Sequence, residues 1–383
     1  MLRDLFDPGR PVSEMLHFLL LTFSLIALII SAEVLVRGGA GLARTLGVPP
    51  LVAGLTVVAF VTSAPQMTIA VRAILAGSAD LVPGMVVGSN IFAVLFTLAL
   101  AASVAPLVVT HRFVRFEVPA VVAASLLLLV LALDGSLGPV DGIALVLGLV
   151  VFTPMLVLHA LQETEEDEPA APNPDQPDRR GKVWTKYGKA HRILYDLCLI
   201  AFGVVLLILG TGWLVDAAAA IAPRFGMSDT VASLTLVAAC ACLPGVATSI
   251  QATLRGEPEL AVGAVLGSCA FNILAVAGIA ALLAPTPIAV PPALLGFDML
   301  IMTAVAAACL PLLFTGNRIE PWQGAIFFAF YVGYVFYLVM ATVSHDAIDG
   351  WRLAMIAFVL PLTVLTFAVI VWRKLWDIAE AEA

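Results

Sequence analysis

The sequence predicts an all-α membrane protein that crosses the bilayer many times. Only 12% of its 383 residues are charged and 61% are hydrophobic, and the mean hydropathy is +1.06. A soluble domain carries roughly 25% charged residues, so most of this surface must face lipid and not water. Long apolar runs follow one another along the chain, and an internal repeat relates its two halves.

Eleven apolar runs are long enough to be transmembrane helices, because about 20 apolar residues cross the hydrocarbon core. Lipid offers no partners to backbone polar groups, so helices are the natural structure for these runs. The predicted spans are 15–36, 50–71, 81–106, 117–134, 138–160, 193–215, 229–253, 259–284, 291–314, 322–343 and 352–372.

Segment 162–192 interrupts this pattern with a Pro-rich stretch of seven acidic and six basic residues. Such a composition cannot bury enough apolar surface to fold alone, which favours a solvated linker, with a regulatory binding site as the less favoured alternative. The linker separates a first unit, 1–161, from a second unit, 193–343. Residues 344–383 hold the additional helix and a tail.

Basic residues in the loops predict the orientation. The side of the membrane that holds the N-terminus carries five Lys and Arg residues, and the opposite side carries fourteen. We therefore expect an outside N-terminus, and a long loop and C-terminus in the cytoplasm, in a plasma (inner) membrane. No basic footprint for nucleic acid is present, and the sequence does not indicate an oligomeric state.

An internal repeat appears at an offset of 179 residues. LVRGGAGLARTLGVPPLVAGLT (35–56) aligns with LVDAAAAIAPRFGMSDTVASLT (214–235), and the same offset places Asp141 over Glu320. Each copy holds five spans, an odd number, so the second copy must enter the membrane from the other side. The predicted fold is therefore two inverted repeats of five helices plus one extra C-terminal helix. Inverted repeats are an architecture of secondary transporters, which hold substrate at the repeat interface.

Two prolines mark a candidate site within these repeats. Pro65 and Pro244 occupy equivalent positions, and each frees a backbone carbonyl and kinks its helix. Freed carbonyls and small hydroxyls near the midplane could coordinate a cation, although a kink that serves only packing remains the alternative. Asn90 adds a strong polar group to an apolar run, where such groups are often functional but can also simply hold helices together.

These stretches resemble the cation/calcium exchanger superfamily, and the sodium/calcium exchangers in particular. The resemblance covers about residues 20–343 and rests on AEVLVRGGAGLARTLGVPPLVAGLTVVAFVTSAPQM with GSNIFAVL. The second copy is GWLVDAAAAIAPRFGMSDTVASLTLVAACACLPGV with GSCAFNIL. The resemblance implies exchange of calcium for sodium, with ions held between the second, third, seventh and eighth helices.

The chain departs from the family at the residues that carry this chemistry. The family motif is Gly-Thr-Ser-x-Pro-Glu in each repeat, and the two signature glutamates are replaced here by Gln66 and Gly245. Cys269 stands where the family has Asn or Asp. The polar side chains that remain, and that form the candidate cation pocket, are those of Thr62, Ser63, Gln66, Asn90, Cys242 and Cys269.

A pocket without carboxylates disfavours calcium, which takes six to eight oxygen ligands including carboxylates. Neutral oxygens suit a monovalent ion better. We therefore expect a cation antiporter of altered selectivity, acting on sodium and less readily on calcium. The alternative is an exchanger fold that no longer transports and acts as a scaffold or regulator. Small residues near Gly245 predict an open cavity, which would favour transport.

Other polar residues leave alternatives open. Glu33 is either an interfacial acid beside Arg37 or a replacement ligand. Arg72 either reaches the outer interface or turns inward and takes the place of a bound cation. The sulfur atoms of Cys240, Cys242 and Cys269 could bind a soft metal, although such residues more often only pack. Four acids near predicted helix ends are assigned no chemistry: Glu117, Asp134, Asp196 and Asp298. No catalytic or cofactor motif appears, so the sequence does not predict an enzyme.

Overall fold

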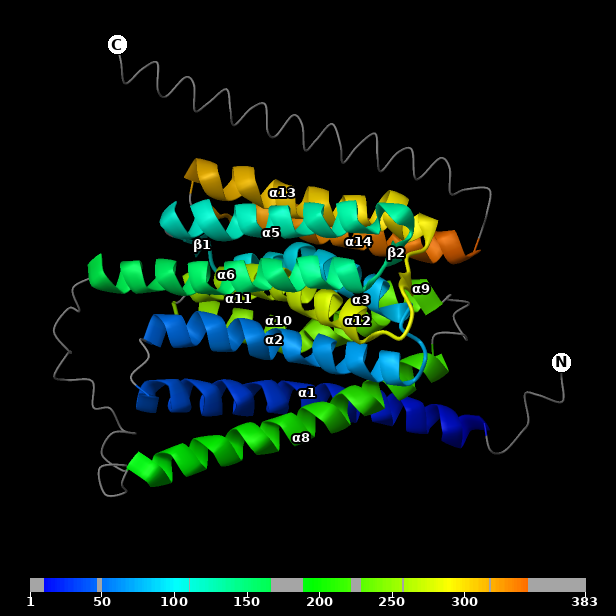
Figure 1. Cartoon of the computed structure of the whole chain (residues 1–383), viewed down its shortest axis with the longest axis horizontal. Coiled ribbons are helices and arrows are strands. Elements are labelled where there is room, and N and C mark those ends of the chain that lie inside the picture. Colours follow the sequence, from blue (N-terminus) through cyan, green and yellow to red (C-terminus); the bar gives the residue numbers. More distant parts are fainter. Residues whose placement is uncertain are drawn as a thin grey trace, which may run out of the picture.

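The computed structural model describes residues 10–46, 50–109, 111–166, 189–221, 229–256, 258–316 and 318–343. Its long helices lie side by side in one bundle (Figure 1). The predicted eleventh span, 352–372, and most of the linker 162–192 lie outside the described residues.

Helices of the first half follow the predicted spans closely. They are α1 (Arg10–Leu46), α2 (Pro50–Leu75), α3 (Leu81–Phe92), the π-helix η2 (Ala93–Thr97), α4 (Leu98–Val104), α5 (His111–Leu131), the short 3-10 helix η3 (Ala132–Asp134) and α6 (Pro139–Glu166). The helical segments α3, η2 and α4 form one continuous span, Leu81–Val104.

The second half has a similar series of helices, with two further π-helices. They are α8 (Lys189–Ile221), α9 (Asp229–Ala232), π-helix η5 (Ser233–Val237), α10 (Ala238–Leu254), α11 (Pro258–Phe271), π-helix η6 (Asn272–Ala277), α12 (Gly278–Leu283), π-helix η7 (Leu294–Asp298), α13 (Met299–Gly316) and α14 (Pro321–Val343). The π-helices η2 and η6 begin at positions 93 and 272, which differ by the repeat offset of 179.

Burial separates central helices from peripheral ones. Spans Leu81–Val104 and Pro258–Leu283 are buried along most of their length, whereas Ala190–Ala218 of α8 is mostly exposed although it is strongly apolar. Helices α1 and α8 pack along one side of the bundle, and α5, α13 and α14 lie on the other (Figure 1). Exposed apolar helices around a packed centre are what a bilayer requires.

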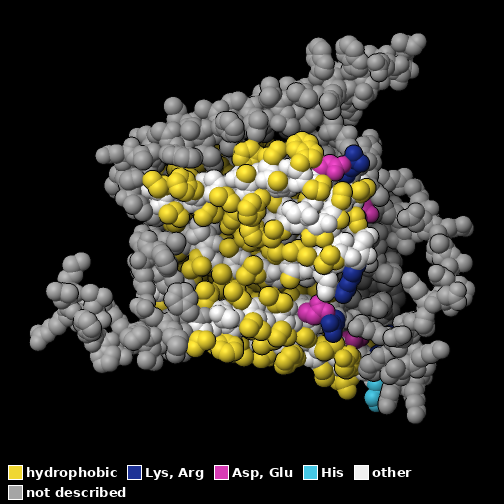
Figure 2. Space-filling model, turned by 180° about the vertical axis from the view of Figure 1, so that it is seen from behind, with side chains coloured by type: hydrophobic (Ala, Val, Ile, Leu, Met, Phe, Trp, Pro, Cys, Tyr) yellow, Lys and Arg dark blue, Asp and Glu magenta, His cyan; other side chains and the backbone are white. Residues whose placement is uncertain are grey.

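Seven helices among the described residues are long and apolar enough to cross a membrane. One face of the molecule is covered by hydrophobic side chains, and its charged side chains gather at one edge (Figure 2). An apolar patch far larger than a soluble monomer exposes identifies a surface for lipid. The chain is thus an all-α polytopic membrane protein, as the sequence predicted.

Two short ribbons join the halves. Strand β1 (Leu107–Val108) pairs antiparallel with β4 (Arg318–Ile319), and β2 (Ser136–Leu137) pairs with β3 (Ile288–Ala289). Adding 181 to the β1 positions gives β3, and adding 182 to the β2 positions gives β4. Each ribbon therefore pairs one half with the other, and the two ribbons have the same register.

The ribbons correct one detail of the repeat alignment, because the offset of 179 does not hold through the fifth helix. Asp141 accepts a hydrogen bond from the Gly138 amide at 2.8 Å, and Gln323 accepts one from the Glu320 amide at 2.8 Å. The structural equivalent of Asp141 is thus Gln323, at an offset of 182, and not Glu320. The connections of the second half are longer by three residues in total.

Candidate functional site

The proline-containing helices α2 and α10 meet the central helices at one place in the bundle. Ser63 Oγ on α2 donates to the carbonyl of Ser268 on α11 at 3.3 Å. Cys242 Sγ on α10 donates to the carbonyl of Ser89 on α3 at 3.6 Å. Residues 63 and 242, and residues 89 and 268, are each separated by 179. The same contact therefore occurs twice, once from each repeat to the other.

Gln66 is buried, with only 1% of its surface exposed, one residue after Pro65. In the amide orientation that turns Nε2 toward acceptors, it donates to the carbonyls of Thr62 at 2.9 Å and Ser63 at 3.3 Å. The other amide atom then lies 3.3 Å from Cys242 Sγ. Gln66 thus provides donors to backbone carbonyls in its own kinked helix, which a glutamate carboxylate cannot do.

Asn90 joins the central helices. Its Nδ2 donates to the carbonyl of Cys269 at 3.3 Å and lies 3.6 Å from Met302 Sδ. Asn272 Nδ2 in turn donates to Asn90 Oδ1 at 3.2 Å. Both amides are buried between α3 and the α11–η6 segment. The interhelical role that the sequence left open for Asn90 is therefore present, and Cys269 contributes a carbonyl to this network.

A small cavity of about 10 Å³ lies between the proline helices and the central helices. Its volume is about that of one water-sized sphere. Its lining includes Thr62, Gln66, Cys242, Gly245, Ser249 and Ser268. This space is smaller than the open cavity that the small residues predicted, because the Gln66 and Cys242 side chains turn into it.

Gly245 leaves room where the family has a glutamate. A Cβ built at Gly245 would lie 3.9 Å from Thr62 Cβ, which is ordinary van der Waals contact. A side chain at this position would therefore point into the cavity without displacing the backbone. Among the residues that the structure describes, the cavity lining holds no Asp or Glu, so its polar surface consists of neutral groups.

Three buried oxygens near the site have no hydrogen-bond partner in the described part of the chain: Ser89 Oγ, Ser249 Oγ and Asn272 Oδ1. An unpaired buried oxygen costs roughly 1–3 kcal/mol, which a bound cation or water would recover. Ser249 is not among the predicted site residues, although it lies four residues after Gly245 and hence on the same helix face. Ser268 and Asn272 also join the site beyond the predicted set.

The predicted site residues thus fall into two groups. Thr62, Gln66 and Cys242 line the cavity, with Ser63 beside them, whereas Asn90 and Cys269 contact each other in the adjoining amide network. Among the described residues, no group of three or more His, Cys, Asp or Glu side chains could hold a metal ion. The three cysteines named as a soft-metal alternative therefore do not form such a site.

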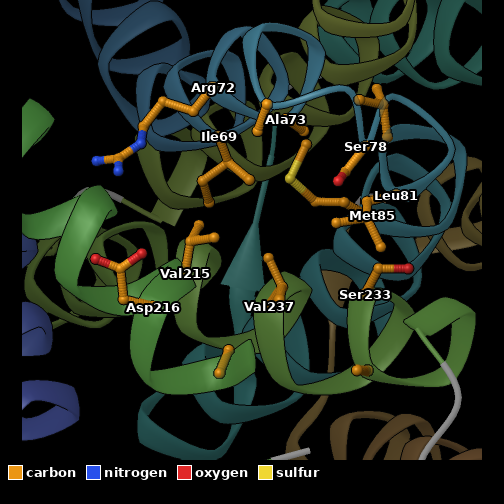
Figure 3. Close-up of a pocket in the computed structure, with 14 residues that line it drawn as sticks. Ile69, Arg72, Ala73, Ser78, Leu81, Met85, Val215, Asp216, Ser233 and Val237 are labelled. Carbon is orange, nitrogen blue, oxygen red and sulfur yellow. The ribbon is translucent and has the colours of Figure 1, made fainter. Parts of the chain in front are cut away.

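Arg72 lines a second and larger cavity of about 280 Å³ between α2, α3, α8 and η5 (Figure 3). Its guanidinium lies against Gly212 of α8, where a Cβ would overlap it. Asp216 lies on the opposite wall at the same end of the cavity (Figure 3). Arg72 does not line the small cavity, so it does not replace a bound cation there.

Glu33 pairs with Arg37 at 2.6 Å, one turn along α1, and both side chains are partly exposed. This is the interfacial arrangement that the sequence favoured. It leaves Glu33 outside the lining of the small cavity, which excludes it as a replacement ligand in this conformation.

Comparison with known proteins identifies relatives along most of the chain. CaxA of Alkalimonas amylolytica, a putative antiporter by name, is 32% identical over 323 residues, which are 82% of this chain and 96% of CaxA. Inner membrane protein YrbG of Escherichia coli is 32% identical over 70% of this chain and 79% of YrbG. Sodium/calcium exchanger MaX1 of Methanosarcina acetivorans is 25% identical over 83% of this chain and 97% of MaX1.

The fold has solved counterparts. The sodium/calcium exchanger from Methanococcus jannaschii superposes with a TM-score of 0.60 at 22% identity, covering 83% of this chain and 97% of that chain. The family described as sodium/calcium exchanger protein matches residues 16–158 and 195–340, and therefore both halves. The two matched ranges coincide with the two halves of the chain, whose proline-containing helices α2 and α10 meet at the candidate site. The chain belongs to the sodium/calcium exchanger family.

Proposed function

We propose that this exchanger-family transporter is a secondary active antiporter selective for monovalent cations, with sodium as its first substrate. The observation that carries the proposal is the small cavity between the paired proline helices, whose described lining consists of neutral groups and lacks a carboxylate. Moving a divalent ion from water into such a site leaves most of its charge uncompensated, which is far more costly than for a monovalent ion.

The architecture that we propose is two inverted repeats of five helices with an eleventh helix at 352–372. The twice-repeated contact from Ser63 and Cys242 supports it, as do the two ribbons of identical register. In inverted repeats the two conformations of the cycle exchange the roles of the halves around a fixed site. The candidate ligands are the groups around the small cavity: Thr62, Ser63, Gln66, Cys242, Ser249 and Ser268, with Asn90 and Cys269 beside them.

A scaffold or regulator without transport is the second candidate. The small volume of the cavity, about 10 Å³, favours it, since a transporting cavity must also admit the ion's path. The unpaired oxygens of Ser89, Ser249 and Asn272 favour transport, because a purely structural core has no reason to keep them unsatisfied.

Uptake of radioactive sodium and calcium into liposomes that carry the purified protein tests the two candidates. We expect the native protein to exchange sodium for sodium and to take up little calcium. The Gln66→Glu, Gly245→Glu double variant restores two carboxylates and should gain calcium uptake. Gln251→Glu is the matched control, because Gln251 is exposed and lies outside the cavity. No flux of either ion through the native protein or the double variant would leave only the scaffold.

Orientation is tested separately. We propose that the N-terminus is outside and the linker 162–192 is cytoplasmic, as the excess of basic residues on that side suggests. A single cysteine placed in the linker should react with a membrane-impermeant maleimide in inside-out vesicles and be protected in intact cells. The reverse labelling pattern would invert the assignment.

A further inference from the structure

Two buried acids occupy equivalent positions in the halves. Glu117 follows Phe116 in α5, and Asp298 follows Phe297 at the end of η7, an offset of 181 that matches the one between β1 and β3. Their exposed fractions are 2% and 4%. Both lie near the starts of apolar spans, as the sequence predicted, and no chemistry was assigned to them on that basis. The structure shows in addition that both are buried, and a buried acid within a membrane protein is usually functional.

Asp298 has a buried hydroxyl partner on another helix. Tyr334 Oη on α14 donates to Asp298 Oδ1 at 2.9 Å, and Tyr334 is only 1% exposed. The residue 182 positions before Tyr334 is Phe152, which stacks on Phe116 with ring centroids 6.0 Å apart and has no hydroxyl. The first half thus has the Phe152 ring, without a hydroxyl, at the position that corresponds to the Tyr334 phenol.

Two short paths connect this pair to the candidate cation site. Met302 lies one turn after Asp298 on the same helix face, and its Sδ contacts Asn90 Nδ2 at 3.6 Å. Tyr331 lies one turn before Tyr334, with its ring 5.3 Å from that of Phe92, and packs on the cluster that contains Cys242. Packed side chains thus connect Asp298 to both the amide network and the cavity wall.

Within the described residues, the elements around Asp298 supply no fixed countercharge. Helix α14 faces it with the phenols of Tyr331, Tyr334 and Tyr337, and neither α14 nor α3 contains Lys, Arg or another acid. Helix α5, which packs along α13, carries Arg112 and Arg115 as well as Glu117. The two helices run antiparallel, so these three positions lie toward the opposite ribbon, away from Asp298. Arg318 is at that opposite end as well, paired with Glu320 at 2.8 Å.

We propose that Asp298 binds the proton that this protein exchanges for its cation. The inference rests on the antiport proposed above and names its second substrate. A monovalent cation bound among the neutral groups of the small cavity favours the Asp298 carboxylate. Opposite charges attract over longer distances in a low-dielectric interior than in water. When the small cavity is empty, the neutral carboxyl is favoured, since burying an unpaired charge is costly.

The exchange step is balanced in charge. As one cation enters the small cavity, the O–H bond of the Asp298 carboxyl breaks and its electron pair stays on the carboxylate. The proton passes to water on the side of the membrane from which the cation came. The Tyr334 hydroxyl donates to the carboxylate that remains. As the cation leaves, one proton returns. One cation moves against one proton, so the cycle carries no net charge and does not respond to membrane voltage.

The test compares two fluxes of radioactive sodium in liposomes that carry the full-length protein. One is uptake driven by an imposed proton gradient, and the other is exchange of sodium for sodium without a gradient. We expect Asp298→Asn to lose the first and keep the second, because its amide cannot carry a proton but still accepts from Tyr334. Glu117→Gln is the matched control and should keep both. Proton-driven uptake that persists in Asp298→Asn overturns the inference and leaves the antiport intact.

Loss of both fluxes in Asp298→Asn is resolved by infrared difference spectroscopy of the native protein. Adding sodium should remove the carbonyl band of one protonated carboxyl, and Asp298→Glu should move that band to a different frequency. Absence of the band change, or a change that Asp298→Glu leaves unmoved, overturns the inference. Failure of the native protein to exchange sodium for sodium is a different result, which counts against the antiport itself.

Discussion

Replacing Gln66 by glutamate should make the stability of the protein depend on calcium. The native amide donates to the carbonyls of Thr62 and Ser63 at 2.9 and 3.3 Å. An ionised glutamate side chain at this position would lose both bonds, each worth about 1 kcal/mol net, and would place a negative charge against two carbonyl oxygens. With the cost of an uncompensated buried charge, roughly 3–5 kcal/mol, the free energy of unfolding should fall by about 5–7 kcal/mol without a cation.

Calcium should recover much of this loss, because it would bind the carboxylate and the carbonyls together. A ligand at about 100 times its dissociation constant stabilises the folded state by about 2.7 kcal/mol. The measurement is thermal unfolding in detergent, with and without calcium, for the native protein and Gln66→Glu. Gln251→Glu is the control, since its exposed site carries no such cost. A Gln66→Glu protein that is as stable as the native one, with or without calcium, would refute this account of the cavity.

Two further predictions concern the close contact between α3 and η5 and the hydrogen bond at the start of α6. Gly88→Ala should lower the unfolding temperature strongly, because its Cβ would overlap the backbone carbonyl oxygen of Leu234. Gly333→Ala is the control and should have little effect, since nothing lies within 4 Å of its Cβ among the described residues. Overpacking of this kind costs typically about 1–3 kcal/mol, and equal unfolding temperatures would contradict the close approach of α3 and η5. Asp141→Ala removes the acceptor for the Gly138 amide and should cost about 1 kcal/mol, as loss of a helix cap does; an unchanged unfolding temperature would show that water replaces the cap.

The sequence predicted the scaffold well because the scaffold depends on local patterns. Apolar length fixes a membrane helix regardless of its neighbours, and ten predicted spans coincide with described helices. Pro65 and Pro244 could be paired from the repeat alone. The structure then brings their helices to the same place, where Ser63 and Cys242 make equivalent contacts.

Sequence patterns could not predict how side chains from distant segments pack around the same cavity. The size of the cavity depends on how Gln66 and Cys242 turn, which no local pattern determines. Ser249 belongs to the site only because α10 presents it on the face that carries Gly245. The depth of Asp298 likewise depends on Tyr334, which is 36 residues away and covers it from another helix.

The two halves share one scaffold but differ in the amide side chains that they bring to the site. Across the repeat, Gln66 corresponds to Gly245 and Ala93 corresponds to Asn272. Two inverted halves with identical donors would give outward-open and inward-open states of similar energy. In the proposed antiport, one half would supply the amide of Gln66 and the other that of Asn272, so the two states would bind the ion with unequal strength. A proton on Asp298, whose Tyr334 partner lies in the second half, would act in the same asymmetric way. The gradients alone set the direction of exchange, so this asymmetry would appear as unequal apparent affinities for sodium on the two sides of the membrane.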